Sequence, residues 1–242
     1  MGDSYPLQLC AHLYFIFSGL GLWFRCVLFR LLRKKPNPAQ ERSDLATRFR
    51  VYLNLLKKWG IIELEYSGFE DASSWRGSII APNHPSILDA VFLLESLPHM
   101  DCVMTARLLR NPITSGAVGL CSFIKNDAVA SMIKTCRSRL AAGSNVLIFP
   151  EGTRTRNKPI NSFYPVYTLV AKCCKAPIRT IIIECDSDYF GKDFSHFKPC
   201  LCPIRFKITA GRVFQTDEAT DTRRLSAEIE EYFRDSLTPT GS

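Results

Sequence analysis

The stretch SIIAPNHPSILDAVFLLESL (residues 78–97) decides the fold class of this chain of 242 residues. Residues 78–83 form a short apolar run without polar alternation, which predicts a buried strand. Residues 86–97 then place apolar side chains at helical spacing, which predicts a helix. A buried strand that passes directly into a helix is the repeating unit of layered α/β folds.

The same alternation continues along the chain. Further strand-like runs lie at 61–69, 102–106, 145–150, 178–185 and 205–214, and helix-like runs lie at 129–143, 163–175 and 222–237. Residues 113–124 fit either type of element. Because most of the strands are apolar throughout, we predict an α/β fold with a mostly parallel or mixed sheet that helices cover on both faces.

The apolar residues are concentrated near the start of the chain. Residues 7–24, LQLCAHLYFIFSGLGLWF, contain no Lys, Arg, Asp or Glu, and their length is at the short end of what spans a bilayer. Asp3 is the only charged side chain before this run, which argues against a secretory signal peptide. A core helix is the alternative. We predict a membrane-associated helical segment at 1–60 and an α/β domain at 61–242.

Within that first segment, residues 34–44 are polar and predict a short connector. Residues 45–61 predict an amphipathic helix that ends at Gly60. This helix could form a hairpin with the first one at the membrane, or pack on the domain as an ordinary amphipathic helix.

The positive charge lies next to the apolar run. Residues 25–58 contain ten Lys or Arg and two Asp or Glu, an excess equal to the net charge of +8 of the whole chain. A basic segment beside an apolar helix suits an anionic lipid surface and predicts that the domain faces the cytoplasm. Nucleic acid is not expected as a partner, because the chain carries no recognisable nucleic-acid-binding motif.

The ten cysteines show no paired spacing of the kind that binds zinc, and we expect them to be reduced. His196, Cys200 and Cys202 could be imagined as metal ligands. They lack a second ligand pair, so no metal site and no disulfide framework is predicted.

Two turns carry candidate chemistry. His84 follows the predicted strand at 78–83, and Glu151 follows the strand at 145–150, so both lie where ligands bind in open α/β sheets. A neutral imidazole can remove a proton from an alcohol, and it does so better when a carboxylate such as Asp89 orients it. The alternative is that Asp89 only caps the helix in a Ser-x-x-acidic pattern.

The second turn, FPEGTRTRNK (149–158), suits phosphate. Gly152 allows close approach to the backbone, and Thr153 and Arg154 offer a hydroxyl and a guanidinium. The alternative is a strand-ending turn in which Glu151 pairs with Arg154 on the surface. Neither a P-loop nor a dinucleotide-binding glycine motif is present.

Taken together, Asn83-His84-x-x-x-x-Asp89 and Phe149-Pro150-Glu151-Gly152-Thr153-Arg154 resemble the signature blocks of the glycerolipid acyltransferase family, which includes the 1-acylglycerol-3-phosphate and lysophospholipid acyltransferases. The resemblance covers residues 60–215, and the apolar segment at the start of the chain is also similar to that family.

The resemblance implies a membrane-associated O-acyltransferase of phospholipid biosynthesis. The family transfers a fatty acyl group from acyl-CoA or acyl carrier protein to a hydroxyl of a lysophospholipid-type acceptor, with no metal or cofactor and no covalent enzyme intermediate. By this resemblance His84 is the general base and Asp89 its orienting partner. The positions that match the phosphate-binding block are Glu151, Gly152, Thr153 and Arg154.

The chain departs from the family pattern between and after the two blocks. Residues 119–127, GLCSFIKND, supply Lys125 where members often carry an arginine, and we expect Lys125 to provide that positive charge in substrate binding. Residues 177–181 read PIRTI instead of the common PIVPV. These changes leave an acceptor other than lysophosphatidate open. Two further functions also stay open: hydrolysis of an acyl thioester or ester, disfavoured by the lack of a GxSxG nucleophile elbow, and non-catalytic binding of membrane lipids.

Overall fold

The computed structural model describes residues 5–97, 99–192 and 201–238. Its centre is a seven-stranded sheet with the order β1-β7-β6-β2-β5-β3-β4. The strands are β1 (Ile62–Ser67), β2 (Ile79–Pro82), β3 (Met100–Met104), β4 (Ile124–Lys125), β5 (Asn145–Leu147), β6 (Ile178–Cys185) and β7 (Ile204–Phe214). Five neighbouring strands, β6 to β4 in that order, are parallel, whereas β7 is antiparallel to β6 and parallel to β1. The predicted mixed α/β fold is confirmed.

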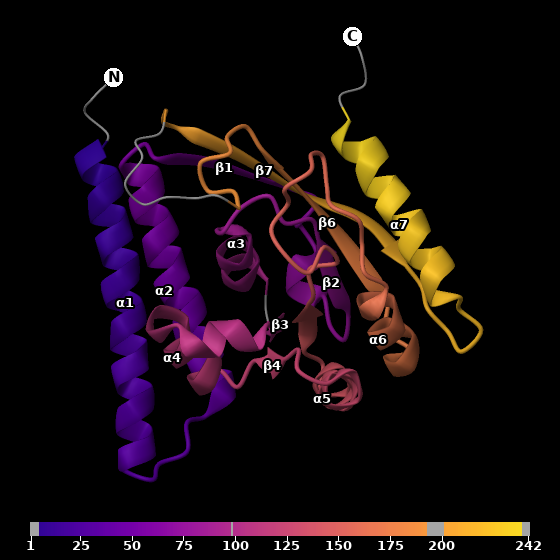
Figure 1. Ribbon diagram of the computed structural model, residues 1–242, viewed down its shortest axis with the longest axis horizontal. Helices are drawn as coiled ribbons and strands as arrows, with labels where there is room; N and C mark the ends of the chain where they lie inside the picture. Colours follow the sequence, from indigo (N-terminus) through magenta and orange to yellow (C-terminus); the bar gives the residue numbers. More distant parts are fainter. Residues whose placement is uncertain (1–4, 98, 193–200, 239–242) are drawn as a thin grey trace.

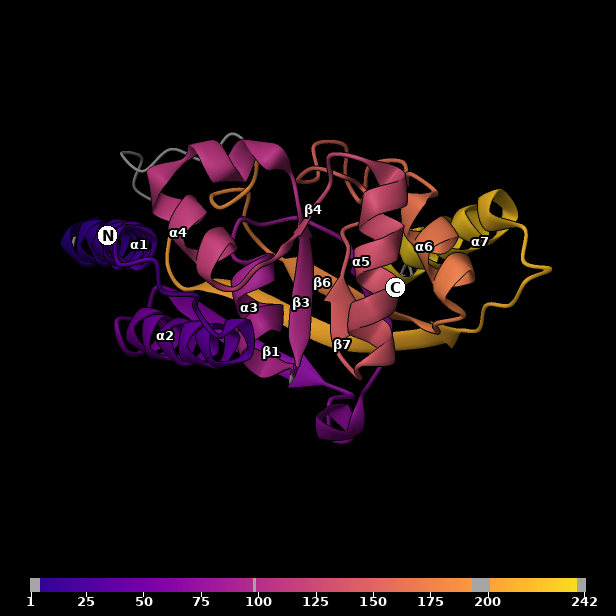
Figure 2. The same cartoon turned by 90° about the horizontal axis from the view of Figure 1, so that it is seen from below.

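Helices cover both faces of the sheet. They are α1 (Tyr5–Leu31), α2 (Pro38–Lys58), α3 (Asp89–Ser96), α4 (Pro112–Leu120), α5 (Val129–Ala141), α6 (Val166–Cys174) and α7 (Thr222–Leu237), with short 3₁₀ turns η1 (Ala72–Ser74) and η2 (Ala106–Arg110). Figures 1 and 2 show α1 to α4 on one side of the molecule and α5 to α7 on the other. Along β2, Ile80 packs with the first group, and Ile79 and Ala81 pack with the second. The strand is therefore buried on both faces, as its unbroken apolar sequence requires.

The second helix starts earlier than the sequence pattern predicts. Helix α2 begins at Pro38, inside the stretch 34–44 that was expected to be a connector, so that expectation is wrong for its second half. The side chain of Asn37 accepts hydrogen bonds from the backbone N–H groups of Ala39 and Gln40, and Pro38 occupies the first turn. An N-cap asparagine followed by proline is a helix start signal that outweighs the polar composition.

Helix α1 is fixed to the rest of the molecule along its length. It lies beside α2 (Figure 1), and the Arg25 guanidinium donates to the buried carboxylate of Glu41 across 2.8 Å. Helix α1 also packs directly on α4, where a Cβ on Gly116 would overlap the backbone of Trp23 and a Cβ on Gly19 would overlap the carbonyl of Ile113. Because α1 and α2 share packing with α3 and α4, the division of the chain at residue 60 stays a prediction.

The opposite face of α1 is apolar and exposed. Its large exposed side chains are Leu9, Leu13, Phe17, Leu20, Trp23, Phe24, Leu28 and Leu31. Among the described residues, Pro6–Leu31 is the one helical stretch that by length and composition could cross a membrane.

Candidate active site

Strand β2 is extended past its end by a side chain. The Asn83 Nδ2 group donates to the Ile183 carbonyl at 2.8 Å, and the Asn83 Oδ1 atom accepts from the Ile183 N–H at 2.7 Å. The amide thus continues the hydrogen bonding between β2 and β6 after the backbone has turned away. This fully buried pairing fixes the position of the next residue, His84, at the carboxyl edge of the sheet.

The structure brings His84 and Asp89 together. The Nδ1 atom of His84 lies 2.8 Å from Oδ2 of Asp89, and the same oxygen accepts the Ser86 N–H at 2.8 Å. The Ser86 hydroxyl in turn accepts the Leu88 N–H at 3.0 Å. These bonds lie in the turn that leads into α3, which begins at Asp89 and has no side-chain hydrogen bond at its N-cap, so one carboxylate holds that turn and contacts the imidazole. The predicted contact between the two side chains is observed, and their roles as base and orienting partner stay predictions.

Burial governs the electrostatics of this pair. Asp89 has 0% exposure, and this burial raises the pKa of its carboxyl group, while the hydrogen bonds from His84 and Ser86 and the charge of Arg154 act in the opposite direction. The His84 side chain is 18% exposed. The ionised carboxylate of Asp89 can only accept a hydrogen bond, so the Nδ1 atom of His84 carries the ring proton. The lone pair on Nε2 is then left for a reactant. This is the tautomer that a general base needs.

The second turn is tied directly to the first. The carboxylate of Glu151, which follows β5, is 1% exposed; its Oε1 atom accepts the His84 N–H at 2.7 Å and the Thr155 hydroxyl at 2.8 Å. Its Oε2 atom accepts the Asn161 N–H at 2.8 Å. Burial raises the pKa of Glu151, and these donors counteract it. The N–H of Thr155 also donates to the His84 carbonyl at 2.7 Å. The contact of Glu151 with phosphate stays a prediction, and both carboxylate oxygens accept hydrogen bonds from protein donors.

The other predicted phosphate residues lie at the rim of this turn. Gly152 is exposed and has a left-handed φ of +65°, the conformation that favours glycine. The hydroxyl of Thr153 accepts a hydrogen bond from Lys192, and the guanidinium of Arg154 donates to the carbonyls of Phe190 and Gly191.

The segment after β6, including Lys192, therefore forms a third side of the site. This contact could not be predicted from the sequence, because Thr153 and Lys192 lie far apart along the chain and meet only through the pairing of β2 with its neighbouring strands.

Lys125 lies at the same edge of the sheet but farther away. It ends β4, the outermost strand, and is exposed. Strands β3 and β5 separate β4 from β2, which puts Lys125 roughly 14 Å from the end of β2 at the usual strand spacing. No hydrogen bond or ion pair of Lys125 with the other predicted site residues is found in the described part of the chain. Its predicted role in acceptor binding is untested.

A further aromatic contact lies on the imidazole itself. The rings of Phe149 and His84 are stacked, with centroids 3.9 Å apart and planes inclined by 21°. Phe149 belongs to the second turn, so it reaches the histidine from the same side as Glu151. The sequence motif contained Phe149 without indicating that it touches the base.

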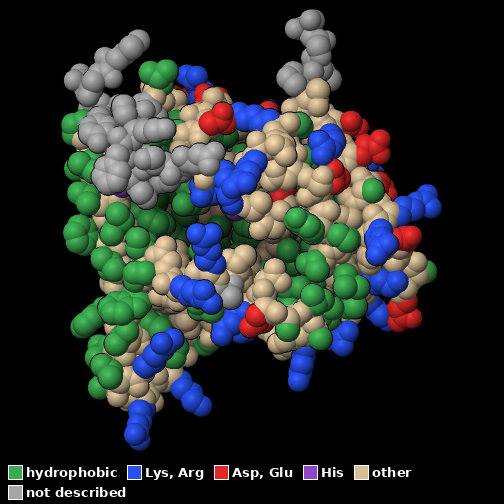
Figure 3. All heavy atoms as spheres, in the orientation of Figure 1, with side chains coloured by type: hydrophobic (Ala, Val, Ile, Leu, Met, Phe, Trp, Pro, Cys, Tyr) green, Lys and Arg blue, Asp and Glu red, His purple; other side chains and the backbone are tan. Residues whose placement is uncertain are grey.

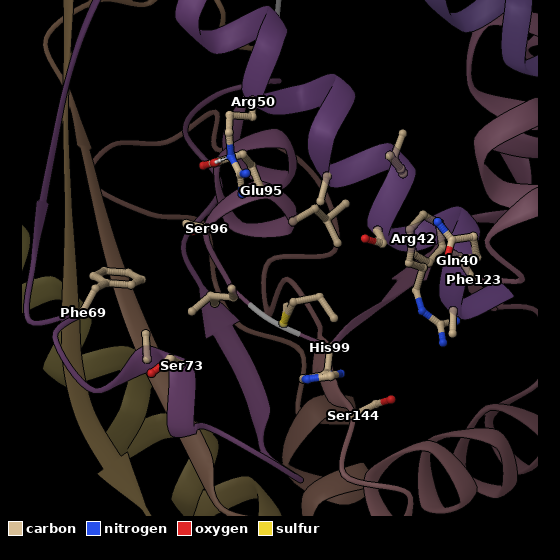
Figure 4. A pocket seen from close by; sticks show the side chains of 18 of the residues that line it. Gln40, Arg42, Arg50, Phe69, Ser73, Glu95, Ser96, His99, Phe123 and Ser144 are labelled. Carbon is tan, nitrogen blue, oxygen red and sulfur yellow. Dashed lines mark hydrogen bonds and ion pairs between the residues drawn. The ribbon is translucent and has the colours of Figure 1, made fainter.

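The surface of the protein has two hollows, and the second lies away from the predicted site residues. In Figure 3, Lys and Arg side chains gather around a hollow in the middle of the view, and hydrophobic side chains extend from it toward the edge formed by α1. A second hollow of about 910 Å³ lies at the amino ends of β3 and β5, between α2 and η1, and contains His99, Ser144 and the Arg50–Glu95 pair (Figure 4). It holds none of the predicted site residues and faces the opposite edge of the sheet.

The candidate metal ligands can be compared with the described part of the chain. They include no group of three or more His, Cys, Asp or Glu that could hold a metal ion, and the nine cysteines among them are free. His196 and Cys200, which were considered as ligands together with Cys202, lie outside the described residues.

Comparisons with known proteins show which family the sequence matches. A family model described as Acyltransferase matches residues 63–184, half of the chain, and the matched region contains both turns. The 1-acyl-sn-glycerol-3-phosphate acyltransferase alpha of mouse is 26% identical over 155 residues, which are 60% of this chain and 53% of that protein, and its human counterpart is 26% identical over 154 residues. The match thus spans about half the length of these curated relatives.

The structural match covers more of the chain than the sequence matches do. The crystal structure of the 1-acyl-sn-glycerophosphate (LPA) acyltransferase PlsC from Thermotoga maritima superposes with a TM-score of 0.70 at 18% identity, covering 96% of this chain and 93% of that one. At this identity the likeness concerns the fold alone, including the helices that precede the first strand. Together with the family match over half of the chain, which includes His84, Asp89 and the turn at 149–154, it leads to one conclusion: the chain belongs to the acyltransferase family.

Proposed function

We propose that this protein is a membrane-associated O-acyltransferase that moves a fatty acyl group from a thioester, acyl-CoA or acyl carrier protein, to a hydroxyl of a phosphate-bearing lysolipid. The observation that carries the proposal is the pairing of His84 with Asp89 at 2.8 Å, directly beside the turn that contains Thr153 and Arg154. A base and a phosphate-suited turn at one edge are what this transfer needs.

The chemistry follows from the tautomer of His84. Its Nε2 atom takes the proton of the acceptor hydroxyl while the hydroxyl oxygen attacks the thioester carbonyl carbon. The buried carboxylate of Asp89 stabilises the imidazolium that forms. When the C–S bond breaks, the leaving thiolate takes the proton from Nε2, which restores the neutral base. The step needs no nucleophile from the protein and no metal.

The acceptor is expected to carry a phosphate. Thr153 and Arg154 supply a hydroxyl and a guanidinium at the rim, and Lys192 adds a positive charge next to Thr153. The names of the curated relatives specify 1-acyl-sn-glycerol-3-phosphate, which makes this lysolipid the first acceptor to test. The departures at Lys125 and at residues 177–181 are the reason to test other head groups beside it.

Membrane association rests on α1. One face of this helix is held by α2 and α4, and the other exposes a row of large apolar side chains (Figure 3). A helix attached to its domain along one side can bury its free side in a membrane surface by lying flat. We therefore infer that α1 lies in the interface, with the basic residues at 25–58 directing the protein to an anionic, cytoplasmic leaflet.

An acceptor panel tests the proposed reaction. Wild-type protein and His84→Ala are incubated with labelled acyl-CoA or acyl carrier protein and with lysolipids that differ in head group, and the product is identified by its mass. We expect a diacyl product with a phosphate-bearing acceptor, lost in His84→Ala. Release of free fatty acid that does not depend on the acceptor would instead establish a hydrolase. Equal activity of His84→Ala and wild type would overturn the assigned base.

A further inference from the structure

Three contacts from one turn converge on His84. The carboxylate of Glu151 holds its N–H at 2.7 Å, the N–H of Thr155 holds its carbonyl at 2.7 Å, and the ring of Phe149 lies against its imidazole. The Thr155 hydroxyl contacts both oxygens of Glu151, at 2.8 and 2.9 Å, which fixes the carboxylate in place. The backbone on both sides of the base and the face of its ring are thus held by residues 149–155.

The stacked ring restrains the one motion that the hydrogen bonds leave open. Asp89 holds the Nδ1 edge of the imidazole, yet a single hydrogen bond allows the ring to tilt about it. Phe149, at a centroid distance of 3.9 Å and an angle of 21°, lies nearly parallel to the imidazole and blocks that tilt. The face of an aromatic ring also attracts a cation, so Phe149 favours the imidazolium that forms during proton transfer.

Glu151 is poorly suited to contact a phosphate. Its carboxylate is negative, 1% exposed, and accepts from His84, Thr155 and Asn161. An acidic group repels a phosphate, and the donors around it would lose their acceptor if the side chain turned away. Arg154 and Thr153, in contrast, lie at the half-exposed rim of the same turn.

We propose that Phe149 and Glu151 are positioning residues for the general base, and that the turn at 149–155 acts as a clamp on His84 while only its rim, Thr153 and Arg154, contacts the acceptor. This assignment rests on the proposed acyl transfer. It divides one sequence block into two roles: the buried half sets the rate of the chemical step, and the exposed half sets the affinity for the acceptor.

The first test asks whether the aromatic face of Phe149 matters or only the volume of its side chain. Phe149→Leu keeps an apolar side chain and removes the aromatic face, whereas Phe149→Tyr keeps the face. We expect Phe149→Leu to lower kcat by about tenfold or more, since misplacing a catalytic group by a fraction of an ångström has effects of this order, with the KM of acceptor and donor unchanged. Phe149→Tyr should restore most of kcat. A wild-type kcat in Phe149→Leu would overturn the role of the ring.

The second test separates positioning from phosphate contact. Glu151→Gln keeps the shape and an acceptor for His84 but places an N–H₂ group near donors, so we expect kcat to fall about tenfold or more while the acceptor KM stays the same. Thr155→Val should act in the same direction, with Thr155→Ser as its matched control that keeps the hydroxyl. A raised acceptor KM with unchanged kcat in Glu151→Gln would make this residue part of the acceptor site and overturn the proposal.

Thermal unfolding and parallel assays of wild type and His84→Ala distinguish a failure of the clamp from a failure of the proposed function. Thermal unfolding of each variant shows that it is folded, and Thr155→Val replaces Glu151→Gln as the deciding variant if the latter does not fold. Wild type and His84→Ala are assayed in parallel. If wild type transfers no acyl group, the proposed function fails, whereas if wild type is active, His84→Ala is inactive and the clamp variants keep a wild-type kcat, only the clamp fails.

Discussion

One oxygen of Asp89 serves two structures at the residue scale. Its Oδ2 atom accepts from the backbone N–H of Ser86, in the turn before α3, and from the ring of His84, the proposed base. The orientation of the base is therefore set by the start of a helix, an element that cannot move without unfolding its first turn. This coupling restrains the Nδ1 edge of the proposed base.

Asp89→Asn should separate the two roles. An amide oxygen can still accept one bond, but the neutral side chain neither stabilises the imidazolium nor fixes the tautomer, so we expect kcat to fall by about 10³ to 10⁴. Ser86→Ala is the control: it removes the hydroxyl that accepts from Leu88 and leaves the backbone bond to Asp89 intact. It should lower the free energy of unfolding by about 1 kcal/mol, measured in urea, with little change in kcat. A near-wild-type kcat in Asp89→Asn would contradict the orienting role.

Arg154→Ala should act mainly on acceptor binding. The guanidinium at the rim donates to the carbonyls of Phe190 and Gly191, and in the proposed function it also binds the acceptor phosphate, so its removal takes away a charge-assisted bond worth about 1.5 to 3 kcal/mol. We expect the acceptor KM to rise by about 10- to 100-fold while the donor KM changes little. Steady-state kinetics with each substrate varied in turn would check this, and Arg154→Lys should recover part of the affinity. An unchanged acceptor KM would refute the assignment.

The sequence could reveal those site residues whose signal is local. His84 and Asp89 lie five residues apart next to a strand end, so the strand–turn–helix pattern allows them to meet, although it equally allows Asp89 only to cap the helix. Asn83, Phe149 and Thr155 belong to the same motifs, but their roles come from contacts across strands that no spacing encodes. Lys192 was not foreseen, because its approach to Thr153 depends on the order of strands in the sheet.

At the scale of elements, the contact between α1 and α4 depends on glycine. The two helices approach so closely that a Cβ on Gly116 would overlap the backbone of α1. Gly21, in contrast, has open space where its Cβ would be. One helix pair thus contains a glycine required by packing and a glycine that packing does not require.

Gly116→Ala should loosen this helix pair, whereas Gly21→Ala should not. The first change forces the backbones apart, and we expect it to lower the free energy of unfolding by about 1 to 3 kcal/mol. The second adds a methyl group to an exposed position in a helix and should be neutral or stabilising by up to about 1 kcal/mol. Denaturant unfolding in the same detergent or lipid would measure both. Equal stabilities of the two variants would contradict the close packing.

The same elements mark the limit of prediction from sequence. The strands and helices from β5 onward were located because their apolar runs are bounded by clear turns. The region 113–124 could not be assigned, since the apolar helix α4 and the two-residue strand β4 follow each other with only a tight turn at 121–123 between them. The start of α2 was predicted too late because its first turns are polar, whereas the N-cap at Asn37 sets the start of the helix.

At the scale of the whole molecule, the exposed apolar face and the basic excess lie on the same part of the chain. Helix α1 exposes its apolar side chains at one edge, and the basic residues between 25 and 58 follow it on the same hairpin (Figure 3). The proposed lysolipid acceptor and long-chain acyl donor both partition into membranes, so a site rigidly joined to such an edge would stay near them. The packing of α1 on α4, which precedes the strand ending in Lys125, provides that rigid connection.

Substitutions on the free face of α1 should release the protein from membranes without disturbing its fold. Phe17 and Phe24 lie seven residues apart, on one side of the helix, and are 67% and 65% exposed. Burying an aromatic side chain in the membrane interface contributes about 1.5 to 3 kcal/mol, so we expect each Phe→Ser change to weaken vesicle binding by about tenfold or more. Val213→Ser, at an exposed apolar position on β7, is the matched control and should bind like wild type. Sedimentation with anionic and neutral vesicles at low and high salt measures the binding, and the anionic preference should shrink as salt rises. Undiminished binding of the Phe17→Ser/Phe24→Ser double variant would show that another surface carries the protein to the membrane.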